Sequence, residues 1–476
     1  MTSTWRMLLT AMTATTVSLS AGCTMGPDYA RPQVQVPSQF RAQVTPAEAS
    51  SYADLPWWSA FQDPALQRLI SEAVGANYDV QIAAARIEQA RANLGVVRSQ
   101  AMPQLDYNTG VGGQRTIVQG LDSADDVDVG TASAVLEAAW ELDVWGRIRR
   151  ATEAASANVF AEEEVQRGVM LTLVTDVAIG YFRLLQLDRE LAVADESSRT
   201  YRGTYDLFNL RYEAGRDSNL PVQRAQAIYN ASLARSADIK RQIEQQENAL
   251  CILLGSYPRP IVRGSLADQT IPATPLGSTS DILQRRPDIR AAEQEMVAAN
   301  AEIGVAIANF FPRIGLSALV GGQGLRIGDD NSSFGLWSAG LGVAGPIFNG
   351  GRLQSIYEGR KAFWDERVAQ YRKTVLIAFS ETSDALVAQQ RLAAQREALQ
   401  AQIKNLKESN DLALTRYDGG RASYFEVLEA QQQLYPAEGE LAQIQGAQLI
   451  ASVNLYKALG GGWRQQTVAD WKHQTQ

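Results

Sequence analysis

The sequence predicts a mixed α+β membrane protein, internally duplicated, with long helices and four strands in each chain. Three observations lead to this fold class. First, RYEAGRDSNLPVQRAQ at 211–226 returns as RYDGGRASYFEVLEAQ at 416–431, with eight identical positions at a spacing of 205 residues. Second, proline is absent from 104–220 and 347–435, where helical patterns run much longer than a globular helix. Third, four segments alternate apolar and polar side chains with a period of two.

The N-terminus predicts export. Residues 1–22 have the layout of a signal peptide, with Arg6 before a modestly apolar run and small residues before Cys23. Ala21-Gly22-Cys23 resembles a lipoprotein cleavage box, which would leave Cys23 as the acylated N-terminus; the alternative is an ordinary secretory cleavage beside an incidental cysteine. Downstream no run of about 18 apolar residues appears, so we expect no transmembrane helix in the mature chain. A bilayer would then be crossed by strands of a closed barrel.

Composition excludes several classes of function. A net charge of −8 and a pI near 5.1 do not fit a nucleic-acid-binding protein, which needs a basic stripe. The chain has a single histidine, His473, which almost excludes histidine-based metal sites and general-base catalysis by histidine. No GxSxG motif, phosphate-binding loop or metal-ligand cluster is present in the sequence. We therefore expect no enzymatic activity, no metal and no cofactor besides the lipid on Cys23. Cys251, within NALCILLG, is expected to be a core residue.

Each half of the chain reads as a helix, a strand, a polar loop, a strand, a long helix, a turn and a helix. In the first half, strands are expected at Gln104–Gln119 and within TASAVLEAAWELDVWG (131–146). In the second half they are expected at Arg313–Ile327 and within SSFGLWSAGLGVAGPIFNGG (332–351). The polar loops between the strands read LDSADD and GDDNSS.

The long helices carry apolar seams that step by three and four residues. The seam positions are Tyr201, Tyr205, Phe208 and Tyr212 in the first copy, and Leu399, Ile403, Leu406, Asn410, Ala413 and Tyr417 in the second. This spacing favours coiled-coil packing against neighbouring helices. At the turn that follows, Gly215 and Gly420 are expected to end the helix, and Ser218 and Ser423 to cap the next one.

The strand patterns place acids on one face and apolar residues on the other. In 131–146, the residues Leu136, Ala138 and Trp140 share a face, while Glu137 and Glu141 lie on the opposite one. Such alternation is typical of a barrel strand between lipid and water. Four strands are too few to close a barrel with a lumen, so several chains must share one barrel.

The motifs resemble those of the TolC-type outer membrane factors, in the lipoprotein branch (NodT family) that serves resistance-nodulation-division efflux pumps. The resemblance covers nearly the whole chain. It is carried by the two turns and by GPDYARP (26–32), WWSAFQDPALQRLI (57–70), RRPDIRAAE (285–293) and GPIFNGGR (345–352). It implies a homotrimer, with a 12-stranded outer membrane β-barrel continuous with a long periplasmic α-helical coiled-coil barrel.

The resemblance also implies a function and a division of the chain. The trimer would be the exit duct of a tripartite efflux pump in a Gram-negative outer membrane, lipid-anchored and extending into the periplasm. Its partners would be a periplasmic adaptor protein, an inner-membrane transporter and outer membrane lipid, with no nucleic acid. The predicted segments are a signal peptide (1–22), a lipidated N-terminal equatorial segment (23–62), a first repeat (63–255), an equatorial linker (256–280), a second repeat (281–461) and a C-terminal tail (462–476).

The family places an acidic constriction just beyond the second turn, which here corresponds to Glu426 and Glu429. Three chains would put six carboxylates around a narrow periplasmic opening that favours cations. Tyr417 matches a gate-bonding tyrosine of the family, and an Arg224–Glu429 pair between neighbouring hairpins is a further hypothesis. The alternative for both glutamates is a solvated helix face. Candidate adaptor contacts at the turns are Gly215, Arg216, Ser218, Gly420, Arg421 and Ser423, whose alternative is turn chemistry alone.

Other functions stay open at this stage. The same architecture serves type I protein secretion, and metal efflux is a further option, although no methionine-rich relay is present in the sequence. A periplasmic coiled-coil lipoprotein without a pore is the alternative of a different class. The sequence does not identify the exported substrate.

Overall fold

A computed structural model of the chain describes residues 24–34, 37, 39–40, 61, 63–119, 124–272, 279–327 and 330–461. The predicted signal peptide, Cys23 and the C-terminal tail lie outside the described residues. The chain forms two compact units. Unit 1 contains Met1–Gln33, Ala85–Glu163 and Ala291–Arg372, and unit 2 contains Val34–Ala84, Glu164–Arg290 and Lys373–Gln476. Each unit therefore combines segments of both predicted repeats.

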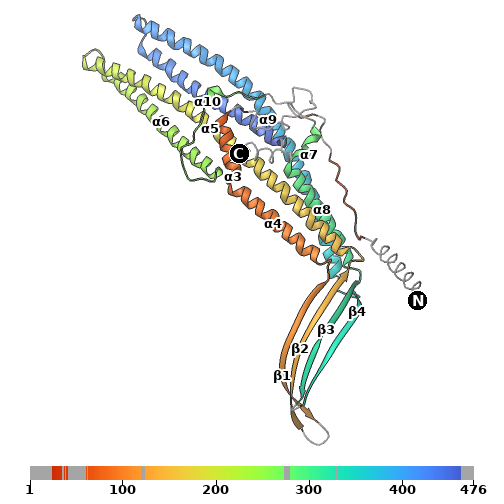
Figure 1. The fold of residues 1–476 in the computed structure, drawn as a ribbon. Coiled ribbons are helices and arrows are strands. Elements are labelled where there is room, and N and C mark those ends of the chain that lie inside the picture. Colours follow the sequence, from red (N-terminus) through yellow and green to blue (C-terminus); the bar gives the residue numbers. More distant parts are fainter. Residues whose placement is uncertain are drawn as a thin grey trace. The chain divides into compact units, whose positions relative to one another are not determined.

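Unit 1 contains one antiparallel sheet, with the strands in chain order (Figure 1). The strands are β1 (Gln104–Gln119), β2 (Ala124–Leu142), β3 (Arg313–Ile327) and β4 (Asp330–Ala344). The bounds predicted for β1 and β3 are confirmed. The strands β2 and β4 begin earlier than predicted, inside LDSADD and GDDNSS, because the hairpin ladders continue as far as Gln119–Ala124 and Ile327–Asp330.

The strand register produces one apolar face across all four strands. Tyr107 lies opposite Leu136, Leu136 opposite Val320, and Val320 opposite Trp337. All four side chains are exposed, Tyr107 and Trp337 each to 79%. On the other face, Asp106 lies opposite Glu137. A sheet with an exposed apolar face and a polar face has the pattern of a membrane barrel wall.

Unit 1 also holds the N-terminal motif GPDYARP against its helices. Arg150 is buried, and its guanidinium donates to the Met25 carbonyl oxygen at 3.1 Å and to Asp28 at 3.0 Å. A Cβ on Gly304 would lie 2.6 Å from that same carbonyl oxygen, so a glycine is required there. Arg31 pairs with Glu293 further along the motif. These contacts give the motif a structural purpose, which is to fix the N-terminal segment to the unit.

The helices of the two halves match in length. Residue counts are 22 for α4 (Tyr78–Ser99) and α8 (Pro287–Ala308), 67 for α5 (Arg147–Glu213) and α9 (Arg352–Asp418), and 35 for α6 (Asn219–Leu253) and α10 (Tyr424–Ala458). The shorter elements are α3 (Pro64–Ala76), η2 (Leu266–Asp268), η3 (Thr279–Asp281) and α7 (Ile282–Arg285). The element order is the one predicted for both halves, except that additional short helices precede α4 and α8 where a single helix was expected.

The predicted helical seams contribute to the core of the hairpins in unit 2 through Tyr201, Leu399, Ile403 and Ala413, whereas Tyr212 is exposed. Leu399, Ile403, Leu434, Ala437 and Ile444 make one buried cluster, so the α9 seam packs on α10. The α5 seam continues this packing, since the ring of Tyr201 meets that of Tyr435 edge-on at 5.8 Å. Figure 1 shows the α5–α6 and α9–α10 hairpins that these contacts join. Cys251 is fully buried, as predicted.

One described helix, α5, contains a stretch long and apolar enough to span a membrane by length and composition. The apolar pattern of the sequence predicted no such stretch. Of this stretch, 61% is buried inside the chain, and α5 includes the fully buried Val177, Tyr181 and Leu184. Packing as a core helix accounts for its apolar character.

Glycines at the helix ends repeat at a spacing of 205 residues and have the same backbone conformation in both copies. Three of the glycine pairs at this spacing have a positive φ in both copies, which favours glycine. The pairs are Gly146 and Gly351 (74° and 85°), Gly215 and Gly420 (70° and 67°), and Gly255 and Gly460 (63° and 88°). They lie just before the long helix, at the tip turn and just after the second helix of each hairpin. The repeated sequence thus encodes the same set of helix ends twice.

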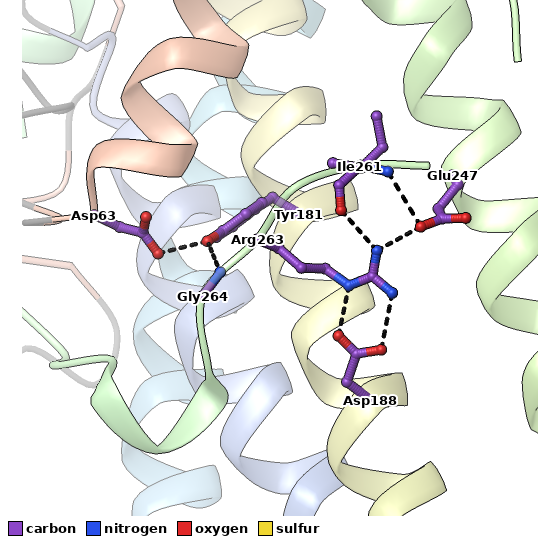
Figure 2. Close-up of polar contacts among 7 residues, drawn as sticks. All are labelled: Asp63, Tyr181, Asp188, Glu247, Ile261, Arg263 and Gly264. Carbon is purple, nitrogen blue, oxygen red and sulfur yellow. Dashed lines mark hydrogen bonds and ion pairs between the residues drawn. The ribbon is translucent and has the colours of Figure 1, made fainter. Parts of the chain in front are cut away.

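Within unit 2, the described part of the predicted linker is held against the helices by two polar clusters, one of them buried and one partly buried (Figure 2). The Arg263 guanidinium donates to both carboxylate oxygens of Asp188, at 2.5 and 2.9 Å, and to Glu247 at 2.5 Å. Beside it, the Tyr181 hydroxyl donates to Asp63 at 2.6 Å and accepts from the Gly264 N–H at 3.0 Å. The linker therefore lies against α5, α6 and the start of α3.

The carboxyl group of Asp63 makes the stability of this region depend on pH. Burial acts to raise the pKa of Asp63, but hydrogen bonds from Tyr181, from two backbone N–H groups of α3 and from Gln269 together hold it below its ordinary value of 3.8. A carboxyl group whose pKa is lowered on folding adds stability above its unfolded pKa. That stability is lost as the pH falls through the folded value.

We expect the apparent Tm of the wild-type protein to fall below about pH 4 more steeply than that of the Asp63→Asn variant, whose amide does not titrate. Circular dichroism of the detergent-solubilised protein across acidic pH measures the difference. Asp268→Asn, which changes an exposed aspartate in the same linker, should retain the wild-type slope. Equal slopes for wild type and Asp63→Asn would contradict this prediction.

Candidate functional site

The candidate site lies at the tips of the two helical hairpins in unit 2. At the first tip, the Arg216 N–H donates to the Arg211 carbonyl oxygen at 2.9 Å and the Gly215 N–H donates to that of Tyr212 at 2.9 Å. The second tip repeats this pair of bonds through Arg421 and Gly420, at 2.8 and 2.9 Å. Both helices thus end in a Schellman motif with glycine in the left-handed conformation.

The predicted tip residues are all exposed. Ser218 and Ser423 occupy the N-cap positions of α6 and α10, but neither side chain makes a capping hydrogen bond. The prediction of their position is therefore confirmed, and that of their capping bond is wrong. Without a capping bond, the two hydroxyl groups are available to a partner. The exposed candidates for adaptor contact are Gly215, Arg216, Ser218, Gly420, Arg421 and Ser423.

An aromatic cluster below the tips joins the two hairpins. The Tyr424 ring packs edge-on against Tyr417 at 5.0 Å and against Phe208 at 5.2 Å. Its hydroxyl group lies 2.5 Å from that of Thr204 on α5, and the Arg211 guanidinium lies over the Tyr417 ring. Sequence reasoning identified Tyr417 but missed Tyr424. One sequence signal for Tyr424 was available. The two tip turns differ at this position, which is Tyr424 in the second turn and Asn219, 205 residues earlier, in the first.

Tyr417 has a buried hydroxyl group with no hydrogen-bond partner among the described residues of the chain. A buried hydroxyl group without a partner costs roughly 1–3 kcal/mol. The structure therefore places Tyr417 beside the tip turn but shows no hydrogen bond that would make it a gate-bonding residue.

Glu426 and Glu429 line a groove of about 600 Å³ between α9 and α10. Glu426 lies in the first turn of α10, and its carboxylate is 3.7 Å from the Arg416 guanidinium. Glu429 is exposed one turn further on. Leu412 and Ala413 form part of the opposite wall, so both carboxylates share one exposed, partly apolar groove.

The predicted Arg224–Glu429 pair does not form within the described part of a single chain. Arg224 is exposed on α6, and the nearby ion pair is Arg416–Glu426. Because the hypothesis concerned neighbouring hairpins, a pair between copies of the chain stays a prediction. Among the described residues, no three His, Cys, Asp or Glu side chains are grouped as a metal site.

Comparisons with known proteins give this geometry a context. The outer membrane efflux protein family matches residues 69–256 and 279–461. The chain is 37% identical over 452 residues to the solvent efflux pump outer membrane protein SrpC of Pseudomonas putida, covering 93% of this chain and 96% of SrpC. It is 34% identical over 450 residues to the cation efflux system protein CusC of Escherichia coli, covering 93% and 96%. Its fold is similar to that of the outer-membrane channel OprN, with a TM-score of 0.84, 29% identity, and coverage of 93% and 100%.

Proposed function

The chain belongs to the outer membrane efflux protein family, and on that premise we propose that three copies form the exit duct of a three-component efflux pump. The protein is an outer membrane component of an efflux system. The observation that carries the proposal is the four-stranded sheet of unit 1. It has one exposed apolar face, and its outer strands β1 and β4 each pair with one strand among the described residues, which suits a third of a 12-stranded barrel. Acylation of Cys23 would add an anchor in the same membrane.

The tips would dock on a periplasmic adaptor, and an inner-membrane transporter would supply the energy. Support comes from the tips themselves, which repeat the same hydrogen-bonded turn twice in each chain. Each turn exposes an arginine, Arg216 or Arg421, after a glycine and before an N-cap serine that makes no side-chain capping bond. A trimer would present six such turns to its partner. Repetition of this kind suits an adaptor that binds in several equivalent copies.

The carboxylates of Glu426 and Glu429 would form the acidic gate of the duct. Both are exposed on one groove, which leaves them free to face the axis of an assembled trimer. The Arg416–Glu426 ion pair is the contact within the chain that opening would change.

The transporter of the pump, and not this chain, would determine which class of substrate is exported. The relatives include a solvent efflux pump protein and a cation efflux system protein at similar identity, so the duct is compatible with unlike cargoes. We propose small molecules delivered by the transporter. The efflux interpretation from the sequence is confirmed, in preference to type I secretion and to a rod without a pore.

Conductance of the purified protein in a planar lipid bilayer tests the proposed duct. We expect discrete, low, cation-selective steps, because a carboxylate ring narrows the pore and favours cations. The proposed duct would be contradicted by protein that inserts into the bilayer and does not conduct, even when Glu426 and Glu429 are substituted to release the tips.

A further inference from the structure

We propose that unit 2 carries a binding site for a small aromatic amine in its protonated form, in the groove between the two helical hairpins of one chain. The groove is lined by α5, α6 and α10 and has a volume of about 770 Å³. Volumes of about 300–1,000 Å³ are typical of small-molecule sites. The groove shares no lining residue with the one that holds Glu426 and Glu429. Because it lies within a single chain, the site does not depend on the proposed duct.

The helix α5 forms the floor of the groove, because its lining residues are buried. These are Glu190, Val193, Ala194, Ser197 and Tyr201, each 5–7% exposed. The walls come from α6 and α10. The Tyr201 ring meets that of Tyr435 on α10 edge-on at 5.8 Å, so the floor and one wall join at a pair of aromatic rings. An aromatic guest would find both apolar surface and ring contacts there.

The Glu190 carboxylate lies at the floor and is held by both hairpins. It accepts hydrogen bonds from the Arg235 guanidinium on α6 at 3.2 Å and from the Gln443 amide on α10 at 3.1 Å. A third bond comes from Gln186 on α5 at 2.8 Å. Glu440 on α10 lines the same groove, is exposed, and forms no ion pair with any described residue. The charged lining residues are therefore two carboxylates and one guanidinium, which leave the groove with a net charge of −1.

Two further oxygen atoms of the groove lack a donor within the described part of the chain. Tyr201 is 7% exposed, and its hydroxyl group makes no hydrogen bond with a described residue. Burial, followed by Tyr435 and Tyr424, raises the pKa of Tyr201 to about 12, so this group stays neutral. On α10, Pro436 has no N–H group, so the Gln432 carbonyl oxygen lacks the helix bond that it would otherwise accept. A guest with N–H groups would supply both donors.

These features together define the class of ligand. The net negative charge favours a cation, and the unpaired acceptors favour one with N–H groups. The tyrosine rings attract both an aromatic ring and an ammonium group. A protonated aryl-alkyl amine combines these properties. Duplication alone does not produce the site, since Glu440 stands where the first repeat has Arg235, 205 residues earlier, and the two walls therefore carry opposite charges.

Isothermal titration calorimetry of the full-length protein in detergent tests the site, with 2-phenylethylamine at neutral pH as the probe. We expect saturable binding that Glu440→Gln weakens about tenfold or more, because a charge-assisted hydrogen bond is lost. Tyr201→Phe keeps the ring and removes only the hydroxyl group, so a loss of several-fold is expected. Two analogues should bind more weakly than the probe: 2-phenylethanol has no charge, and benzyltrimethylammonium has the charge but no N–H group.

Glu438→Gln is the matched control, since it removes a carboxylate two residues away on α10 that pairs with Lys407 and lies outside the groove. It should bind the probe as the wild type does. Partition of the probe into micelles is common to all variants, and circular dichroism checks that each one folds; Glu440 is exposed, so its substitution should leave the fold intact.

Three results would overturn the site. They are no saturable binding to the wild type, equal affinity in Glu440→Gln and the wild type, and an equal loss in Glu438→Gln, which would assign the binding to the general charge of α10. The measurement involves no bilayer and no conductance, so its failure leaves the proposed duct untouched.

Discussion

Replacing Glu426 and Glu429 together by glutamine is expected to abolish the cation selectivity of the reconstituted channel. In the proposed trimer the two positions contribute six carboxylates to one constriction. Their summed field attracts cations and repels anions, and glutamine removes the charge while keeping nearly the same volume. We expect the ratio of K⁺ to Cl⁻ permeability, read from the reversal potential in a salt gradient, to fall from well above one to near one.

The same substitution should relieve block by divalent cations. A ring of closely spaced carboxylates binds Ca²⁺ or Mg²⁺ through oxygen ligands, and a bound ion would hold the tips together. Loss of the ring also removes the Arg416–Glu426 contact at 3.7 Å. We therefore expect higher conductance in the double variant and no further rise when a chelator is added.

Glu213→Gln/Asp217→Asn is the matched control for this experiment. It removes two carboxylates from the first tip turn and leaves the groove between α9 and α10 intact. Selectivity should survive in the control. Equal loss of selectivity in both double variants would assign the effect to the general negative charge of the tips, and Glu426 and Glu429 would then be ordinary solvated positions.

The sequence was sufficient for those parts of the fold that repeat. Gly215 and Gly420 could be assigned to helix ends because a glycine after a long periodic helix has one common structural use. The bounds of β1 were predictable because Pro103 ends the preceding helix and the alternation begins directly after it. Each of these patterns occurs in both repeats, so a coincidental match was a poor explanation for it.

Other features depend on long-range pairing that a linear pattern does not contain. The acidic residues at the start of β2 resemble a loop, yet they join the ladder because β1 is long enough to pair with them. Tyr424 looked like an ordinary residue of the tip turn, and its contacts with Phe208 and Thr204 come from a helix more than 200 residues away. The sequence also did not reveal that the tip serines lack capping bonds.

Replacing Arg263 by methionine is expected to produce the largest loss of stability among single substitutions in the linker. Arg263 is 17% exposed, and it joins Asp188 on α5 to Glu247 on α6. Its guanidinium also donates to the Ile261 carbonyl oxygen at 2.9 Å, so it orders the linker backbone. The hydrogen bonds to Asp188, followed by those to Glu247, raise the pKa of Arg263, which keeps it charged at every accessible pH.

Methionine keeps much of the length of the side chain but leaves two carboxylates close together without a cation. Breaking a buried ion pair costs about 3–5 kcal/mol. Because Asp188 is 36% exposed and retains some hydration, we expect a cost of about 2–3 kcal/mol. This corresponds to a fall of about 5 °C in the apparent Tm measured by circular dichroism. Limited proteolysis should show earlier cleavage within 256–272.

Two further variants separate this explanation from a general effect of losing a positive charge. Arg241→Met removes an exposed arginine that pairs with Asp238 on α6 at 2.5 Å, and pairs of this kind contribute about 0.2–1 kcal/mol. Arg263→Lys keeps the charge but cannot donate to both oxygens of Asp188 and to Glu247 from one rigid plane, so its Tm should lie between those of wild type and Arg263→Met. If Arg263→Met and Arg241→Met lowered the Tm equally, the linker would be held by its backbone and its apolar contacts, with Arg263 as a surface residue. The bidentate geometry at Asp188 and the carbonyl contact at Ile261 argue for the larger effect, because both would be lost along with the charge.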